Sequence, residues 1–544
     1  MTLFERILTA RGLTTRAARE DFLQPDYVAV KHDPFLLPDM NKAVARLKQA
    51  RQQGEKIVIY GDYDIDGLSA TALLLDAFDK FGFEDVDAFI PNRFVEGYGM
   101  TMGAVDKVRD MGADLIVTVD TGSLCHAEIA YATSLGIDTV VTDHHNVAET
   151  PPPSVAAVNP KFPGHTYPFR DLCGAGVAFK LVQALQTELD GLPDGYEKWL
   201  LDLVALGTVC DIVTLADENR ANVYWGLEVL KKQQRPGLKA LMMVAGVEPE
   251  QVNARHLGFG LGPRMNAAGR LETAQHALDM LVAHNGLAAL EASEKLEELN
   301  AKRRGIQDAI FEEACVQAEK LADDRVLVVS SDGWNHGVIG IVASKLVEKY
   351  KKPVFIIGER GEEATGSARS FGDFSAADAV RAADDIIIKG GGHGAAAGVT
   401  LATEKIGDFR RRVNEFYDSL QLTNQERYLL PRADVEIDDF SEIDEELVEN
   451  LAKMEPFGNG NPEPVLKITT ASVLNVRRMG ADGQHVKLAL RDKNGKVLQM
   501  LAFNAPEEFF REPGDEVAVW FQPTVNEWQG VRTVEGQLLH IEQA

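Results

Sequence analysis

The chain has 544 residues, of which 45% are hydrophobic and 26% are charged, and its formal net charge at pH 7 is −27. This composition predicts a globular protein of roughly three to four domains and excludes a low-complexity chain. The four cysteines form no Cys-x-x-Cys pair, which argues against both a disulfide framework and a thiolate zinc site.

The start of the chain contains no basic region followed by an apolar run, so we expect no signal peptide. The most apolar stretch, residues 199–213, is short and is interrupted by Asp202 and Asp211. We therefore expect no membrane segment and a cytoplasmic protein. The acidic net charge disfavours a nucleic-acid partner without excluding it, because binding depends on local charge and bound cations reverse the sign of a carboxylate-lined site.

Strands and helices alternate over residues 41–225, after a partly helical lead-in over residues 1–40. Apolar runs predict four strands, at residues 57–60, 86–90, 115–119 and 139–142. Helical patterns lie between them at residues 68–81, 101–111 and 126–135. Because the strands are apolar throughout, we predict an α/β domain whose parallel sheet is covered by helices on both faces.

Three further regions follow this domain. Residues 226–322 predict a connecting helical region that ends in a long helix over residues 287–321, with Gly305 as its weak point. Residues 323–422 predict a second α/β domain, with strands at 325–329 and 353–357 and helices at 337–350 and 404–420. Residues 423–544 predict an oligonucleotide-binding type of β-barrel, from five short strands at 465–473, 485–490, 497–503, 516–521 and 531–541.

Acidic side chains follow three of the four strands predicted in the first domain. Asp62, Asp64 and Asp66 come directly after the first strand, Asp120 ends the third, and Asp143-His144-His145 ends the fourth. Ligands of open parallel sheets bind beyond the carboxyl ends of the strands, where these clusters fall. One aspartate at a strand end is more often a helix cap or a turn residue. Three such clusters together predict a metal site, and oxygen and imidazole ligands without thiolate favour Mn²⁺ or Mg²⁺.

Four segments resemble, in order, the motifs of the DHH phosphoesterase superfamily: Gly61–Gly67, Val119–Gly122, Asp143–His145 and Gly207–Val213. Within that superfamily the chain most resembles the RecJ family of single-strand-specific 5′→3′ exonucleases. Further matches lie at residues 91–94, 262–270, 366–370 and 390–393. The resemblance covers nearly the whole chain, and it implies a DHH domain, a DHHA1-type domain and an oligonucleotide-binding barrel.

The resemblance implies an enzyme of DNA repair and recombination that hydrolyses single-stranded DNA to 5′-mononucleotides with two Mn²⁺ or Mg²⁺ ions. The implied metal ligands are Asp64, Asp66, Asp120, His144 and Asp211. Asp62 lies close to them in the sequence, and we include it in the predicted metal set. His145, with Asp120 and Asp62, is a catalytic candidate that would position the phosphate or assist proton transfer; a purely structural role is the alternative for His145. The implied partners are single-stranded DNA and, beyond it, a single-strand-binding protein and a helicase, with the enzyme itself a monomer.

Substrate-binding candidates also follow from the resemblance. In the first domain and the connecting region they are Arg93, Arg264, Asn266 and Arg270; in the second domain they are Ser367, Arg369, Ser370, Gly391, Gly392 and His393. Guanidinium groups suit phosphates because they can donate two parallel hydrogen bonds, and a glycine loop allows close approach. In the barrel, strand alternation places Lys487, Arg491 and Trp520 away from the core, which predicts a single-strand contact. The alternative for Trp520 is that it packs beneath another element.

Two positions depart from the pattern of relatives. Tyr60 stands where related pyrophosphatases have a metal-binding histidine, and Thr121 stands where most relatives have asparagine. Asp62 or water could replace the missing ligand. Two other functions remain open at this point: a phosphodiesterase of short nucleotides, which the barrel disfavours, and a catalytically silent replication scaffold, which the complete acidic set disfavours.

Overall fold

The computed structural model describes residues 1–97 and 99–544, which divide into two compact units. The first unit comprises residues 1–297 and 431–544, and the second comprises residues 298–430. In the described part of the chain, no helix is both long and apolar enough to cross a membrane.

The first unit contains a five-stranded sheet in the order β2-β1-β3-β4-β5, in which every neighbouring pair is parallel. Its strands are β1 (Ile57–Gly61), β2 (Val86–Phe89), β3 (Leu115–Val119), β4 (Asp138–Thr142) and β5 (Ala156–Val158). The predicted parallel sheet and its four strands are confirmed. The fifth strand was not predicted, because three residues are too few to show a pattern.

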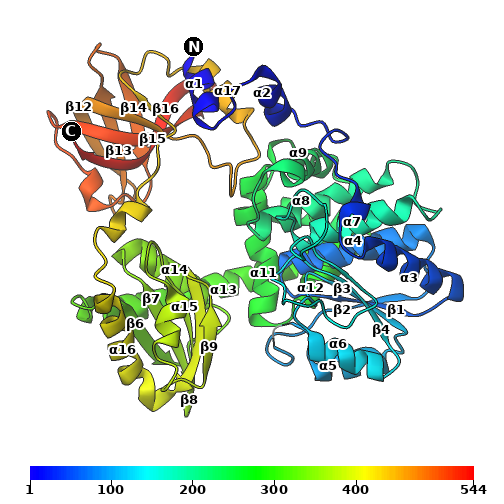
Figure 1. Cartoon of the computed structure of the whole chain (residues 1–544). Coiled ribbons are helices and arrows are strands. Elements are labelled where there is room, and N and C mark those ends of the chain that lie inside the picture. The colour runs from blue at the N-terminus through cyan, green and yellow to red at the C-terminus, as the bar shows by residue number, and fades with distance from the viewer. Residues whose placement is uncertain (98) are drawn as a thin grey trace. The chain divides into compact units, whose positions relative to one another are not determined.

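Helices cover both faces of this sheet (Figure 1). One face packs against α5 (Met102–Asp110) and α6 (His126–Ser134), whose apolar side chains share a core with Val58, Ile116 and Val141. The helices of the other face include α3 (Met40–Gln53), α4 (Ile65–Phe81) and α7 (Gly174–Gln186). The central strands β1, β3 and β4 therefore run between two apolar layers, which leaves their ends for polar chemistry.

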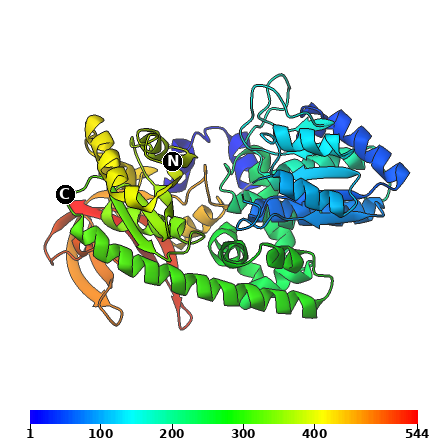
Figure 2. The same cartoon turned by 90° about the horizontal axis from the view of Figure 1, so that it is seen from below.

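The remaining helices of the first unit are mostly short. They are α1 (Leu3–Ala10), α2 (Arg16–Leu23), α8 (Leu201–Cys210), α9 (Asp217–Lys231), α10 (Pro236–Ala245), α11 (Gly262–Leu271) and α12 (Gln275–Leu281), with a π-helical turn at His256–Leu261. Helix α13 (Gly286–Lys320) is one long helix whose residues belong partly to this unit and partly to the second (Figure 2). Gly305 does not interrupt it, because one glycine costs a helix of 35 residues only about 1 kcal/mol.

The second unit has a sheet in the order β6-β7-β8-β10-β9, parallel between β6 and β7 and antiparallel elsewhere. Its elements are β6 (Leu327–Asp332), α14 (Ile339–Tyr350), β7 (Val354–Arg360), β8 (Glu363–Arg369), α15 (Ala376–Arg381), β9 (Lys389–Gly392), β10 (Ala396–Ala402) and α16 (Ile406–Ser419). The predicted glycine loop is in part wrong: residues 389–392 form the edge strand β9, because backbone pairing with β10 compensates for the weak strand preference of glycine.

The second segment of the first unit, residues 431–544, contains a small barrel. Its strands are β11 (Val435–Ile437), β12 (Leu466–Met479), β13 (His485–Arg491), β14 (Val497–Ala502), β15 (Glu516–Trp528) and β16 (Val531–Gln543). Pairing of β12 with β15 closes the barrel, as predicted. Helices α1 and α17 (Glu445–Ala452) contribute Leu3, Ile7 and Leu447 to the barrel's core.

Candidate metal centre

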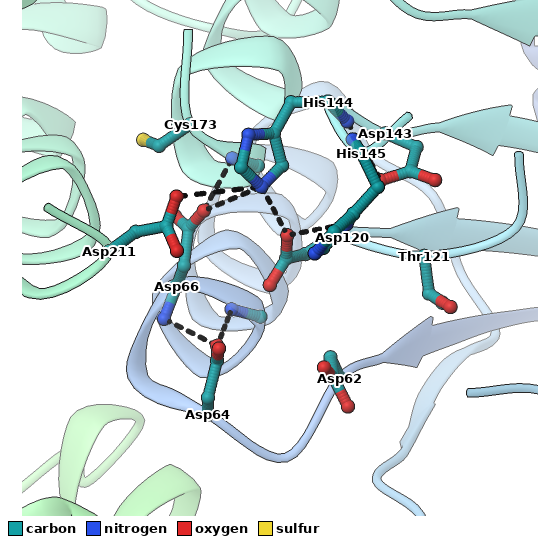
Figure 3. Close-up of polar contacts among 12 residues, drawn as sticks. Asp62, Asp64, Asp66, Asp120, Thr121, Asp143, His144, His145, Cys173 and Asp211 are labelled. Carbon is teal, nitrogen blue, oxygen red and sulfur yellow. Dashed lines mark hydrogen bonds and ion pairs between the residues drawn. The ribbon is translucent and has the colours of Figure 1, made fainter. Parts of the chain in front are cut away.

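The carboxyl ends of β1, β3 and β4 bring the predicted acidic clusters together (Figure 3). Asp211, at the end of α8, points into the same place. His144 lies at the middle of the group: its Nε2 atom is 3.0 Å from Asp120 Oδ1, 3.5 Å from Asp211 Oδ2 and 3.8 Å from Asp66 Oδ2. The clustering of these side chains agrees with the predicted metal site.

Two sets of three residues can be distinguished, and within each set the ligand atoms all lie within 4.8 Å of one another. One set comprises Asp66, His144 and Asp211, and the other comprises Asp62, Asp64 and Asp120. Asp120 also lies within that range of the two histidines, so it is placed between the sets. The arrangement therefore offers ligands for two neighbouring cations.

Local structure fixes the carboxylates. Asp64 caps α4 by accepting hydrogen bonds from the Asp66 and Gly67 amides, at 2.9 and 3.1 Å. Asp66 in turn accepts hydrogen bonds from the first amides of α7, those of Gly174 and Ala175. The positive end of the α7 dipole thus faces a carboxylate, which favours its ionised form.

Glycines leave room for these side chains. A Cβ atom on Gly174 would lie 2.5 Å from Asp120 Cβ, and one on Gly207 would lie 2.4 Å from Asp66 Oδ1. Contacts that short do not occur between real atoms. Glycine is therefore required at these two positions of α7 and α8.

Several polar atoms of the cluster have no hydrogen-bond partner among the described residues. Both carboxylate oxygens of Asp120 and Nε2 of His144 are buried and have no hydrogen-bond partner there. Leaving such groups unpaired is costly, roughly 1–3 kcal/mol each and more when charged. Oxygen and imidazole donors without thiolate suit Mn²⁺ or Mg²⁺, so this donor set fits two such ions.

The pKa values of the clustered carboxyl groups show that the site lacks positive charge. Burial, followed by the neighbouring carboxylates, raises the pKa of Asp62 to about 7, of Asp66 to about 6 and of Asp211 to about 8. The pKa of Asp120 is raised well above its ordinary value for the same reasons. Bound cations reverse this effect, because they favour the ionised carboxylates.

The pKa values of the two histidines are shifted in opposite directions. Burial, together with the charge of His145, lowers the pKa of His144 to about 4, which leaves its imidazole neutral and able to bind a metal. His145 Nδ1 lies 2.9 Å from Asp143 Oδ1; although burial opposes it, this hydrogen bond raises the pKa of His145 to about 9. His145 is also the more exposed of the two, so it presents a positive charge at the rim of the site.

Comparison with known proteins agrees with this geometry. Models of the DHH family N-terminal domain, the DHHA1 domain and the RecJ OB domain match residues 56–208, 323–419 and 433–540. The single-stranded-DNA-specific exonuclease RecJ of Salmonella typhimurium is 35% identical over 92% of this chain and 89% of its own. The chain belongs to the RecJ family.

Two other relatives give the extent of the match. The RecJ exonuclease of Bacillus subtilis is 39% identical over 97% of this chain, which spans 66% of that protein's length. The crystal structure of Thermus thermophilus RecJ in complex with Mn²⁺ has a TM-score of 0.83 and 31% identity, and the match covers 99% of this chain and 75% of that one. The three predicted domain types and their order are thus those of the RecJ family.

The two departures from the family pattern have clear places in the structure. Tyr60 is fully buried and its hydroxyl donates to the Gly99 carbonyl at 3.1 Å. Its ring packs against Phe89. Asp62 offers a carboxylate oxygen within 4.8 Å of ligand atoms of Asp64 and Asp120. The Thr121 side chain is buried and its carbonyl accepts a hydrogen bond from Thr118.

Two of the predicted substrate arginines lie beside the metal centre. The Arg93 guanidinium is 5.0 Å from the centroid of the Tyr63 ring. Burial raises the pKa of Tyr63, and the nearby charges of Arg93 and Arg270 oppose that rise. Tyr63 itself lies between Asp62 and Asp64. Arg264, in contrast, is held by Glu297 and by the Gly260 carbonyl. Asn266 is half-buried on α11 with Arg264 and Arg270.

The predicted substrate residues of the second unit share one region of its sheet. Ser367, Gly398 and Gly391 lie in one row across β8, β10 and β9. Arg369 donates to the Ser367 hydroxyl at 3.2 Å, and both side chains lie against Gly340 in the first turn of α14. Ser370 donates to the Phe374 carbonyl, while Gly392 and His393 are exposed at the β9–β10 turn.

The predicted barrel residues differ in their surroundings. Lys487 pairs with Glu535, and Arg491 is exposed at the end of β13. Trp520 is only 9% exposed: it packs with Val465 and Ala518, and the Lys467 ammonium lies 4.5 Å from its ring centroid. The Trp520 ring is therefore not exposed for stacking with a base; it packs beneath other elements of the barrel, which was the alternative to a single-strand contact.

Three residues near the centre received no individual role from the sequence. Asp143 orients His145 and accepts hydrogen bonds from the Ser123, His144 and His145 amides. Asn159 donates to the His145 carbonyl at 3.0 Å. The positive charge of Lys161 adds to the effect of burial in lowering the pKa of His144, and it opposes the rise that burial causes in the pKa of Asp211. Asp143 could have been found from its motif; the other two follow β5, which has no clear pattern.

Proposed function

We propose that this chain is a two-metal, single-strand-specific 5′→3′ exodeoxyribonuclease that releases 5′-mononucleotides in DNA repair and recombination. The observation that carries the proposal is that both Asp120 oxygens and His144 Nε2 are buried without a hydrogen-bond partner among the described residues, although Nε2 lies 3.0 Å from Asp120 Oδ1 and further carboxylates surround it. Such a set is costly in an empty protein and is stabilised by cations. Membership of the RecJ family supports the choice of substrate, because the curated relatives are single-stranded-DNA-specific exonucleases.

Two divalent cations, Mn²⁺ or Mg²⁺, would be held by Asp62, Asp64, Asp66, Asp120, His144 and Asp211. When bound, they supply Lewis-acid activation of water and neutralise the charge that develops on the phosphate. Thermus RecJ structures in complex with Mn²⁺ and with Mg²⁺ support either ion. His145, whose pKa is raised by its hydrogen bond to Asp143, would hold a phosphate oxygen or donate a proton.

The arginines would bind the DNA backbone. Arg93 and Arg270 lie next to the Asp62–Asp66 loop through Tyr63 and would bind phosphates there. Arg369 has no acidic partner in an ion pair within the described chain, and burial alone lowers its pKa. A desolvated guanidinium beside a serine hydroxyl and a helix N-terminus suits a phosphate. Gly391, Gly392 and His393 would lie along the same strand of DNA, and Lys487 and Arg491 would add weaker contacts on the barrel.

Finer properties of the enzyme also belong to this proposal. We expect a cytoplasmic monomer that works with a single-strand-binding protein and a helicase, as the family resemblance implies. The partition into a lead-in, a DHH domain, a connecting region, a DHHA1-type domain and an oligonucleotide-binding domain is likewise proposed at residues 40/41, 225/226, 322/323 and 422/423.

A panel of substrates tests the function. With Mn²⁺ present, the chain should degrade a 5′-phosphorylated single strand to mononucleotides and leave the matched duplex intact. A 5′ label should appear in mononucleotide before a 3′ label does. Preference for dinucleotides over long single strands would instead favour a short-nucleotide phosphodiesterase, and no hydrolysis of any substrate would favour a silent scaffold.

A further inference from the structure

The loop that follows Asp211 has an unusual backbone. Helix α8 ends at Cys210, Asp211 caps it, and Ile212 then adopts φ +60°. A β-branched residue rarely adopts this left-handed conformation, because its Cβ crowds the following carbonyl. The Ile212 side chain is 69% exposed, so its own packing does not hold the conformation. Some other contact must stabilise the backbone next to Asp211.

That contact comes from a turn 247 residues further along the chain. The Asn459 side-chain amide donates to the Ile212 carbonyl at 2.8 Å, and the Leu215 amide donates to the Asn459 carbonyl at 2.8 Å. One residue thus binds the loop at both ends, from Ile212 to Leu215. In Figure 1 the segment between α17 and β12 descends toward α8 and α9, where this loop lies.

Glycines allow the turn to lie directly against the loop. A Cβ atom on Gly460 would lie 2.5 Å from Thr214 Cγ2, and one on Gly458 would lie 2.8 Å from Leu215 Cδ1. Gly460 also has φ +77°, which side-chain-bearing residues rarely adopt. The turn and the loop therefore lie in direct contact at Gly458 and Gly460, with no room for a side chain at either position.

The turn is itself firmly held. Gly458 and Asn461 exchange backbone hydrogen bonds, and the buried Asn461 amide donates to the Met454 and Pro456 carbonyls. Arg220 of α9 donates to the carbonyls of Met454, Glu455 and Pro456. A turn anchored in this way can oppose strain in the loop that it contacts.

We propose that the turn Gly458–Asn461, which leads into the barrel, positions Asp211 for metal binding through Asn459 and Gly460. The inference rests on the proposed role of Asp211 as a metal ligand. Asn459 does not contact a metal; it fixes the backbone from which Asp211 projects. Residues that orient metal ligands commonly change metal affinity or activity by about 10- to 100-fold when they are removed.

The test measures Mn²⁺ binding to the full chain, from the electron paramagnetic resonance signal of free Mn²⁺, together with turnover as a function of Mn²⁺ concentration. Asn459→Ala should weaken binding of one ion about tenfold, and high Mn²⁺ should restore turnover. Asn459→Leu, which preserves the volume, should do the same. Hydrogen exchange should rise at residues 211–216.

Matched controls lie in the barrel that follows the turn. Asn494→Ala removes an asparagine amide that donates to Asp439, and Gly495→Ala adds a side chain at φ +88° with open space around it. Both should leave Mn²⁺ binding unchanged, whereas Gly460→Ala should weaken it. The comparison of Gly460 with Gly495 separates the contact on Thr214 from the general strain of the left-handed conformation.

Two outcomes would overturn the inference, and they are distinguishable. If Asp211→Ala weakens Mn²⁺ binding but the Asn459 and Gly460 variants bind like the parent, the turn has only a structural role, even if their melting temperatures fall. If Asp211→Ala itself binds Mn²⁺ like the parent, the proposed ligand set is wrong and the inference fails with it.

Discussion

The metal centre of the first unit and the β8 region of the second unit have opposite charge deficits. At the ends of β1 and β3, burial and like charges raise the pKa values of Asp62, Asp66 and Asp120, with no arginine or lysine paired to them in the described chain. On β8, burial lowers the pKa of Arg369, which has no acid paired to it there. The amino end of the first sheet differs from both, because the buried Arg46 is paired with Glu55 and Asp138.

This difference separates charges that serve the fold from charges that serve a ligand. Paired charges such as Arg46 and Asp138 satisfy each other when the chain folds. The unpaired ones make the fold less stable than it could be, and they persist only where something else completes them. The missing partner is cationic at the metal centre and anionic at Arg369, as expected for metal ions and for a DNA backbone.

The largest expected effect is on Asp120. Asp120→Asn keeps the shape but removes the charge placed between the two ligand sets, so kcat should fall by at least ~10³-fold. The control is Asp138→Asn at the opposite end of the sheet, where the carboxylate pairs with Arg46. Its kcat should stay within about threefold of the parent, with some loss of stability. Comparable activity in the two variants would contradict the metal assignment.

Much of this site could be predicted because the strands of the first sheet are continuous apolar runs that end in aspartate. Asp211 could not be predicted from pattern alone, because it enters from a helix end inside an apolar stretch. Strand alternation correctly placed Trp520 opposite Phe521 and the barrel core. It could not show that Ala433 and Leu539, from neighbouring segments, cover that second face.

A second effect concerns His145, a cationic group at the rim of the acidic site whose charge is lost as pH rises through its pKa of about 9. His145→Gln should lower kcat by about 100-fold while Mn²⁺ binding is retained, since proton transfer and phosphate positioning contribute on that scale. Activity that needs the protonated ring should decline as pH rises through about 9.

Asp143→Asn sharpens this prediction, because it removes the acid that raises the pKa of His145. The alkaline limb of the kcat/KM profile should move to lower pH, toward the ordinary histidine pKa of about 6.5. Profiles of parent and variant at one fixed Mn²⁺ concentration measure the shift. An unchanged alkaline limb would mean that His145 has only a structural role.

A smaller effect is expected in the second unit. Arg369→Gln should raise KM for single-stranded DNA about tenfold at nearly constant kcat, because one charged hydrogen bond to phosphate is lost. Arg412→Gln is the matched control: Arg412 already pairs with Asp385, so its loss should leave KM unchanged. Equal KM values in the two variants would remove the distinction between unpaired and paired arginines.

The smallest expected effect is on the stability of the metal-free protein between pH 6.5 and 8. Asp62 and Asp211, with pKa values of about 7 and 8, keep protons in the fold that the unfolded chain has already released. The stabilisation of His145 by Asp143 is fully present below pH 6.5 and is lost as pH rises toward 9. Both contributions have the same sign, so stability should fall as pH rises through this window.

Melting temperatures in the presence of a chelator and in the presence of Mn²⁺ measure this effect. The metal-free protein should lose several degrees between pH 6.5 and 8, since about 1 kcal/mol corresponds to roughly 2–4 °C for domains of this size. Mn²⁺ should reduce the slope, because cations favour the carboxylates in the ionised state that rising pH produces. Asp211→Asn should also reduce the slope of the metal-free protein. A metal-free slope that is flat or positive would show that the acidic cluster is already neutralised by groups of the protein itself, and the contrast with Arg369 would no longer hold.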